Sequence, residues 1–300
     1  MSVQIFLQGR LLGIEEFLLA GSAQPSAFTG RSRWISLLSE VLPRGILAEL
    51  GLSPMLLGHA GGGQFFLQLP GDFRSRVETI LSAARSQVAA LSGGRLRLAW
   101  TSTEDLGEWP IVRKRLADQF SDHLGAALHQ PAASVFEPFD PQPPAPADED
   151  YFLTYLVHAL DTATHVSWSA SDPARVLPGE IGQHRWPLGS SDGIYFPRQR
   201  VDFAPNARLG MLLGDVDGFG TRLRRAGSID EYLRTAATYK DFFAGELRIG
   251  MMSLPDVADR VTLLYSGGDD FAAFGHWDSL ILVARQLQRV FKIHSDTNLK

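Results

Sequence analysis

The stretch LLYSGGDDFAAFG (residues 263–275) places two adjacent aspartates directly after two glycines, between two apolar runs of strand length. Glycine permits the positive φ angles of a tight turn, so this pattern predicts a β-hairpin with the aspartates at its tip. Gly-Gly-Asp-Asp is also an ordinary surface-turn sequence, because glycine and aspartate are common turn residues. The meaning of the paired carboxylates therefore depends on what surrounds them.

A second copy of this hairpin lies earlier in the chain. HAGGGQFFL (residues 59–67) aligns with YSGGDDFAA (residues 265–273) at a constant offset of 206 residues, so that two glycines and a phenylalanine coincide. Gly63 and Gln64 take the positions of the two aspartates, and Arg10 lies near the position that Asp215 takes in the second copy. One copy therefore carries carboxylates that the other lacks, which indicates a duplication with one acidic member.

The elements around the first hairpin follow a recognisable order. Apolar runs predict strands at residues 3–9, 55–59, 64–70 and 95–102, and apolar residues at helical spacing predict helices over 32–49 and 73–91. Pro43 should kink or split the first of these helices. The order β-α-β-β-α-β is that of a ferredoxin-like domain.

The second copy shows the same order up to its last helix. The run LGMLLGDVDGFG (residues 209–220) predicts a strand that ends in Asp215 and Asp217, which share a face if the strand continues that far. Ser228 and Glu231 have the spacing of a helix-capping box. Strands at 261–265 and 271–275 and an amphipathic helix follow, and the chain ends before a last strand, which predicts an exposed sheet edge.

The segment between the copies has a different composition. Residues 131–150 are rich in proline and end in acidic residues, as in a linker; residues 151–168 fit either a helix or a strand pair, and 169–206 show no clean period. The predicted fold class is therefore α+β, with two ferredoxin-like domains that have antiparallel sheets. The predicted boundaries are 1–130, a linker and connector at 131–208, and 209–300.

Composition restricts the class of protein further. The 300 residues contain no cysteine, carry a net charge of −5 and include no apolar run long enough for a signal peptide or a membrane span. We therefore expect a cytoplasmic protein without a membrane partner. The net charge argues against binding nucleic acid through overall charge, and the local basic spots at 113–115 and 222–225 fit solvated helix faces.

The carboxylates point to metal-dependent nucleotide chemistry. In a ferredoxin-like sheet the first strand lies beside the hairpin, so Asp215 should come close to Asp269 and Asp270. Three close carboxylates repel one another unless a cation is supplied, and oxygen ligands are those that Mg²⁺ and Mn²⁺ prefer. Two such ions can activate a 3′-hydroxyl and stabilise a leaving pyrophosphate. The histidines show no metal-ligand spacing.

GDVDGFG, followed by YSGGDDFAAFG and a helix, resembles the second palm domain of the large, Csm-type subunit of type III CRISPR effector complexes. GRSRWISLLSEVL (residues 30–42) and LLGHAGGGQFFLQLP (residues 56–70) are similar to its first palm domain. The resemblance implies two facing palm domains that bind ATP and join it into cyclic oligoadenylates when the complex binds target RNA. Its implied partners are ATP and the other subunits of the complex with guide RNA and target RNA.

The resemblance also implies roles for individual residues. Asp269 and Asp270 would be catalytic, and Asp215 would join them in holding Mg²⁺ or Mn²⁺. The nucleotide pocket would include Ser266, Gly267 and Gly268, and Gly61 and Gly62 would hold an ATP in a non-catalytic first palm. The family's nuclease domain has no counterpart in this sequence, so no DNase activity is expected.

Two other functions stay open. The chain fits a subunit that binds nucleotide or protein without turnover, because the last strand and a docking domain are missing from the sequence. It also fits a diguanylate-cyclase-like enzyme that uses GTP, because GGDDF is shared with that class.

Overall fold

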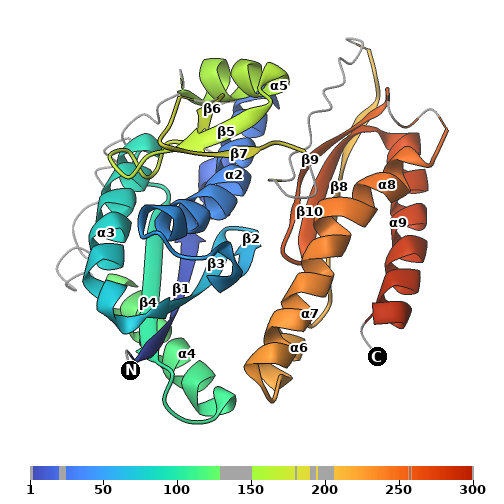
Figure 1. Ribbon diagram of the computed structural model, residues 1–300. Coiled ribbons are helices and arrows are strands. Elements are labelled where there is room, and N and C mark those ends of the chain that lie inside the picture. The colour runs from blue at the N-terminus through green and yellow to red at the C-terminus, as the bar shows by residue number, and fades with distance from the viewer. Residues whose placement is uncertain are drawn as a thin grey trace, which may run out of the picture.

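The computed structural model describes residues 3–19, 25–128, 151–179, 181–189, 194, 206–255, 257 and 259–298. These residues form three antiparallel sheets, of which the first and second belong to the two duplicated domains and the third to the connector (Figure 1). The predicted α+β class is confirmed. In this part of the chain, no helix combines the length and the hydrophobicity needed to cross a bilayer.

The first domain is built on a four-stranded sheet. Its strands are β1 (Gln4–Leu12), β2 (Leu57–Gly61), β3 (Gln64–Pro70) and β4 (Arg97–Glu104), in the spatial order β2-β3-β1-β4. Its helices are α1 (Ile14–Leu19), α2 (Pro25–Glu49), α3 (Arg74–Leu91) and α4 (Trp109–Leu128). The predicted ferredoxin-like order β-α-β-β-α-β is present, with α1 added before α2 and α4 added after the last strand.

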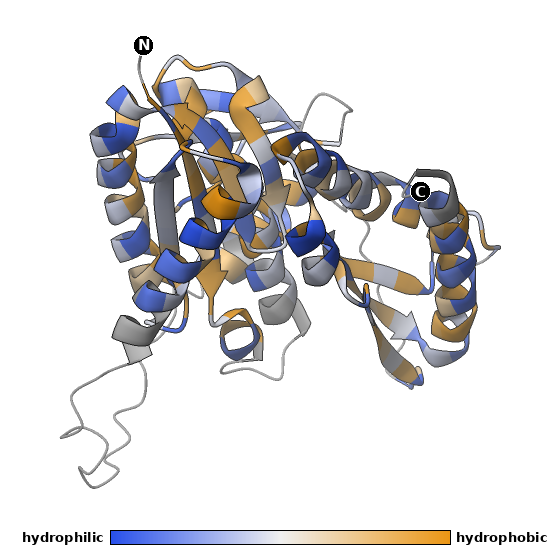
Figure 2. Cartoon of the chain, turned by 90° about the horizontal axis from the view of Figure 1, so that it is seen from below, coloured by the Kyte–Doolittle hydropathy of each residue, from blue (hydrophilic) through white to orange (hydrophobic). Residues whose placement is uncertain are grey.

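Alternation along the strands decides which helix covers which face of this sheet. Ile5 and Leu7 of β1 pack in one core with the apolar residues of α2 and α3, whereas Phe6 packs with Trp109 of α4 on the other face. Successive strand residues point to opposite faces, so one apolar run serves both layers. The helices carry apolar and polar residues in turn, as their colouring in Figure 2 shows.

Two details of the first domain differ from the sequence prediction. The sequence predicts a strand over residues 55–59, but Pro54–Leu56 form a 3₁₀ turn and β2 begins at Leu57. The turn is capped by the Ser53 side chain, which accepts a hydrogen bond from the Met55 N–H. Of the kink or split expected at Pro43, the split is wrong, since α2 continues through this residue, and the kink stays a prediction. Neighbouring residues such as Leu42 are buried in the core, and that packing offsets a proline cost of about 3 kcal/mol.

The connector folds onto the first domain in the part that the structure describes. A π-helix (Tyr151–Ala159), α5 (Leu160–Thr162), β5 (His165–Trp168), β6 (Leu177–Pro178) and β7 (His184–Pro187) follow one another, with the sheet order β6-β5-β7. Tyr151, Phe152 and Trp168 belong to the same buried cluster as the α2 and α3 residues. The proline-rich segment 131–150 lies outside the described residues.

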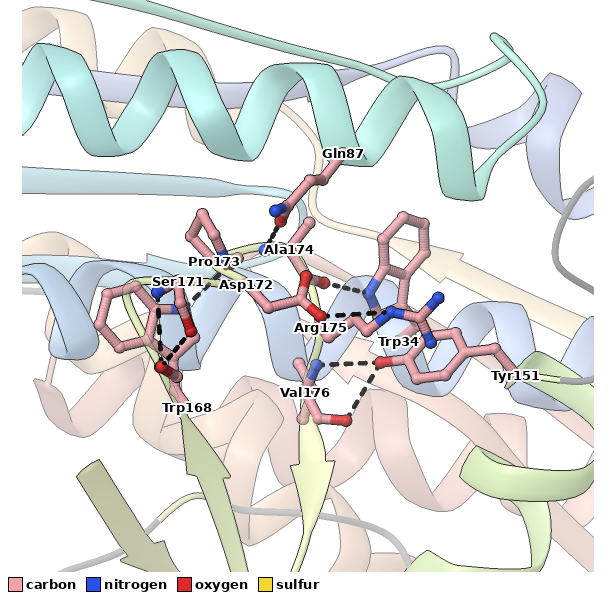
Figure 3. Close-up of polar contacts among 11 residues, drawn as sticks. Trp34, Gln87, Tyr151, Trp168, Ser171, Asp172, Pro173, Ala174, Arg175 and Val176 are labelled. Atoms are coloured by element: carbon pink, nitrogen blue, oxygen red, sulfur yellow. Dashed lines mark hydrogen bonds and ion pairs between the residues drawn. The ribbon is translucent and has the colours of Figure 1, made fainter. Parts of the chain in front are cut away.

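Polar contacts hold the connector in place (Figure 3). Trp34 of α2 donates its Nε1–H to the Ala174 carbonyl over 2.9 Å, and the Ala174 N–H donates to Oε1 of Gln87 on α3 over 3.0 Å. The Tyr151 hydroxyl both accepts from the Val176 N–H (2.9 Å) and donates to the Val176 carbonyl (3.1 Å). The connector therefore satisfies buried polar groups of the first domain as well as adding to its core.

The second domain has a three-stranded sheet among the described residues. Its elements are β8 (Leu209–Asp215), α6 (Phe219–Arg225), α7 (Ile229–Asp241), a π-helix (Phe242–Glu246), α8 (Leu247–Met252), β9 (Val261–Gly267), β10 (Asp270–His276) and α9 (Trp277–Asn298), and the sheet order is β8-β10-β9. The predicted capping box is present, because the Ser228 side chain accepts from the Glu231 N–H. No strand pairs with the outer edge of β8 in this part of the chain.

Strand register confirms the internal duplication. Arg10 of β1 pairs with Gln64 of β3, and Asp215 of β8 pairs with Asp270 of β10. The residue before Arg10 and the residue before Asp215 are both glycines, and each lies against a phenylalanine ring. A Cβ on Gly9 would be 2.2 Å from Phe65, and one on Gly214 would be 2.1 Å from Phe271. Equivalent backbone positions in the two domains therefore face the same packing constraint.

Candidate functional site

The tips of the two glycine hairpins meet at the domain interface. A Cβ on Gly62 would lie 3.4 Å from the Gly267 carbonyl oxygen and from the Gly268 Cα, and one on Gly267 would lie 3.3 Å from the Gly62 nitrogen. Gly62 and Gly268 both have positive φ angles, of 59° and 66°. The two turns therefore need glycine both for their own conformation and for the approach of the opposite hairpin.

Each domain also places a long helix, α2 or α7, near the hairpin of the other. The Ser32 hydroxyl of α2 donates to the Leu264 carbonyl of β9 over 3.2 Å. From the second domain, Tyr232 of α7 packs against His59 of β2 and Phe66 of β3 in the first hairpin. The ring centroids of these residues lie 5.7 and 5.6 Å from that of Tyr232. These reciprocal contacts fix the position of the two hairpins relative to each other.

A cavity of about 810 Å³ lies where the hairpins meet. Its lining includes every residue that the sequence analysis assigned to the nucleotide pocket: Gly61, Gly62, Ser266, Gly267 and Gly268. Asp270 lines it as well, whereas Asp215 and Asp269 are not among the lining residues. The structure thus brings both glycine motifs and one of the two hairpin carboxylates to a single cavity.

The other two carboxylates lie beside this cavity. Asp215 stands opposite Asp270 in the β8–β10 pair, and the Val216 N–H donates to the Asp269 carbonyl over 3.0 Å. Burial, and then the nearby Asp215 carboxylate, raise the pKa of Asp269 above its usual range. Asp269 and Asp215 are therefore close enough to repel each other, which is the situation that a bound cation relieves.

Asp217 does not share the strand face that was considered for it. β8 ends at Asp215, and the chain then turns through Gly218, which has a φ of 73° and precedes α6. Asp217 is exposed on this turn. Among the described residues, no three His, Cys, Asp or Glu side chains are arranged so that they could hold a metal ion.

Cations that the sequence analysis did not identify line the same cavity. They are Arg44 of α2, Lys240 of α7 and Arg248 of α8. Lys240 forms an ion pair across the domain interface with Glu40 of α2, at 2.8 Å between Nζ and Oε1, and Arg44 contacts the second oxygen of that carboxylate at 3.0 Å. These three cations share the lining with the carboxylates of Glu15, Glu40, Asp241 and Asp270, so the cavity carries charges of both signs.

Tyr239 lies close enough to Asp269 to interact with its charge, and Arg222 hydrogen-bonds to Tyr239. Burial raises the pKa of Tyr239, against the charge and the hydrogen bond of Arg222, and Asp269 raises it further. The Ser266 hydroxyl donates its hydrogen to the Phe243 carbonyl over 2.6 Å, so this hydrogen is already used within the chain. No local sequence pattern singles out Arg222 or Tyr239, because only the packing of α7 beside the hairpin brings Tyr239 to Asp269, and Arg222 of α6 joins through Tyr239.

The fold and the site together define a tandem palm protein, in which two ferredoxin-like domains face each other and only one has the acidic tip. Residues 208–299 match the family model of the Cas10/Cmr2 second palm domain. A curated relative, the CRISPR system single-strand-specific deoxyribonuclease Cas10/Csm1 (subtype III-A) of Thermococcus onnurineus, is 28% identical over 106 residues, which cover 31% of this chain and 14% of the relative.

Solved structures extend the similarity to nearly the whole chain. Crystal structures of a Csm1–Csm4 cassette in complex with cA3 and in complex with one ATP match it with TM-scores of 0.75 and 0.76, at 17% and 18% identity. Each match covers 99% of this chain, which spans about half the length of the matched chain (48% and 49%). The chain is thus similar to the large palm-domain subunit of type III CRISPR complexes, and its predicted palm fold is confirmed.

Proposed function

We propose that this chain is a metal-dependent nucleotidyltransferase that joins ATP into cyclic oligoadenylates as part of a cytoplasmic type III CRISPR complex. The observation that carries the proposal is the shared cavity, where both glycine hairpins meet and whose lining contains Asp270 together with the cations Arg44, Lys240 and Arg248. Matched Csm1–Csm4 structures hold ATP, cA3 and cA4, which supports adenine nucleotides as the ligands. The proposed partners are the other subunits with guide RNA and target RNA.

The chain's own residues account for binding and orientation. The hairpin glycines leave the backbone open to a triphosphate, and the three cations offer charge-assisted hydrogen bonds to its phosphate oxygens. In the reaction, the 3′-hydroxyl oxygen of one nucleotide loses its proton to solvent and bonds to the α-phosphorus of the next, while the bond between that phosphorus and the α,β-bridging oxygen breaks and pyrophosphate leaves. The cavity holds the two reactants in this orientation, which replaces a bimolecular encounter. The first palm supplies binding only, because Arg10 and Gln64 stand where the second palm has Asp215 and Asp270.

Asp215, Asp269 and Asp270 are the residues that would hold Mg²⁺ or Mn²⁺, which requires their side chains to converge, because in the described part of the chain they do not form a ready three-ligand site. They fit such an ion in chemistry, since Asp215 and Asp269 are close enough to raise the Asp269 pKa, and carboxylate oxygen is the preferred ligand. A bound divalent ion would supply activation of the 3′-hydroxyl and neutralisation of charge on the leaving pyrophosphate.

The test is to incubate the full chain with ATP and Mg²⁺ or Mn²⁺, alone and assembled with RNA-bound partner subunits, and to identify products by mass spectrometry. We expect cyclic oligoadenylates that disappear in the double variant Asp269→Asn, Asp270→Asn. Asp118→Asn is the matched control, because this aspartate is exposed on α4, far from the lining of the cavity. Undiminished product in the double variant would show that these aspartates are not catalytic.

A second candidate function is a palm subunit that binds nucleotide without turnover. It is favoured by one observation, namely that Asp270 alone of the three predicted carboxylates lines the cavity. ATP binding that Lys240→Met weakens, with no product under any activating condition, would support it. Turnover of GTP in the absence of ATP turnover would instead favour a diguanylate-cyclase-like enzyme.

A further inference from the structure

A second cavity lies in the first domain, along β4. It has a volume of about 730 Å³ and is lined by the six consecutive strand residues 97–102, by Glu78, Arg85 and Ala89 of α3, and by Gln119 of α4. β4 is an edge strand, since the sheet order is β2-β3-β1-β4. The strand therefore forms the floor of a groove between two helices, and none of its lining residues belongs to the cavity at the domain interface.

The hydrogen-bond pattern shows which backbone groups face this groove. The Asp105 N–H donates to the Gln4 carbonyl over 2.8 Å, and the β1–β4 register continues without interruption from Ile5–Glu104 to Leu12–Arg97. In an antiparallel pair, alternate residues direct their N–H and C=O to the partner strand. Leu98, Trp100 and Ser102 therefore direct theirs to the outer edge, where no strand pairs with them in the described part of the chain.

This edge lacks two of the devices that usually protect an exposed strand, namely proline and a bulge. β4 contains no proline, and its pairing with β1 shows no bulge. Three residues with outward backbone groups, spaced every second position, match the repeat of an extended peptide rather than the shape of a compact ligand. The groove is therefore suited to strand addition.

Each side of the groove carries an arginine. Arg85 lies over the Trp100 ring at 4.9 Å on the α3 side, whereas the Thr101 hydroxyl contacts Gln119 Oε1 at 2.7 Å on the α4 side. By alternation the exposed Arg97 belongs to the same face as Thr101. With Glu78 as the one acidic side chain of the lining, the groove is positively charged on balance.

We propose that the β4 edge binds an extended, acidic peptide segment of another protein, which adds a fifth strand to the sheet of the first domain. Backbone groups of Leu98, Trp100 and Ser102 would pair with the peptide. Two consecutive acidic side chains, which point to opposite faces of an added strand, would meet Arg85 on one side and Arg97 on the other. This interaction is independent of the nucleotide site.

The probe is the capped hexapeptide Thr-Val-Glu-Glu-Val-Thr, titrated into the full chain while amide chemical shifts and hydrogen exchange are followed by NMR. We expect saturable binding, with new protection of the amides of Leu98 and Trp100. Ser102→Pro removes one outward N–H and leaves the inward pairing intact, so it should abolish the effect. Arg97→Glu should weaken binding by about fivefold or more, as expected when an exposed charge pair is reversed.

Controls separate the proposal from its alternatives. Arg76→Glu changes an exposed arginine of α3 that does not line the groove, and should leave binding unchanged. Equal binding of Thr-Val-Lys-Lys-Val-Thr would overturn the acidic preference, and binding that survives Ser102→Pro, in a variant with a normal folded spectrum, would overturn strand addition. Amides that are already protected in the free protein, with concentration-dependent dimerisation, would show that a second copy occupies the edge instead.

Discussion

His59 should make the domain interface sensitive to acid. Its ring stacks on Phe66, with ring centroids 5.8 Å apart and an interplanar angle of 5°. The ring of Tyr232, on α7 of the second domain, also packs against it, with centroids 5.7 Å apart. Its Nδ1 is buried without a hydrogen-bond partner among the described residues. Burial first, and then the charges of Lys240 and Arg10, lower the pKa of His59 to about 3.

The sign of the effect follows from proton linkage. The folded-state pKa lies below the unfolded-state value of 6.5, so the stability that the neutral ring contributes is fully present above pH 6.5. It is lost as the pH falls through 6.5 toward 3. Since one pKa unit corresponds to about 1.4 kcal/mol, the loss of unfolding free energy from this residue should reach about 2 kcal/mol at pH 5.

The assay compares the protein with its His59→Phe variant, which keeps an aromatic ring for stacking and cannot take up a proton. The free energy of unfolding in urea is measured for both near pH 7.5 and near pH 5. Carboxylates titrate equally in both proteins, so the difference between them isolates His59. If both proteins lose the same stability between the two pH values, the ring is protonated at no cost in the folded state and the reasoning is wrong.

Three further outcomes are expected. Gly214→Ala should lower the free energy of unfolding by about 1–3 kcal/mol, because its new Cβ would lie 2.1 Å from Phe271. Gly220→Ala should change this free energy little, because its Cβ meets only the end of a flexible arginine. Equal urea unfolding curves for the two variants would contradict this. Lys240→Met should weaken ATP binding about tenfold by calorimetry, since it removes a charged donor and leaves Glu40 facing the cavity; unchanged affinity would place the phosphates elsewhere. EDTA should abolish product formation and Mn²⁺ should restore it, whereas turnover in EDTA would exclude metal dependence.

Local patterns predicted the core of both domains well. The apolar stripe of α3, including Val77, Leu81 and Val88, is buried as its spacing required, and the capping box at Ser228 begins α7. Comparison of the two copies also placed Arg10 near the position of Asp215, and the strand register makes the two positions equivalent, since Arg10 pairs with Gln64 as Asp215 pairs with Asp270. These features depend on neighbours in sequence or on a repeat that is visible in it.

What sequence could not predict depends on contacts between distant segments. Lys240 joins the cavity because α7 packs against the first domain, and Glu40 meets it from a position 200 residues earlier. The connector was left unassigned because Trp168 and Tyr151 are fixed by the core and carbonyls of another domain rather than by a period of their own. A strand end is equally hard to predict: β8 stops at Asp215 because the chain turns at Gly218 to begin α6.

The matched register of the Arg10–Gln64 and Asp215–Asp270 pairs has an evolutionary consequence. In a symmetric homodimer, one codon change alters both halves of the interface, so an acidic tip could never face a neutral one. Joining two copies in a single polypeptide removes that constraint and lets each half change separately. The covalent connection is therefore what allows the two hairpin tips to differ, with carboxylates in one copy and an arginine and a glutamine in the other.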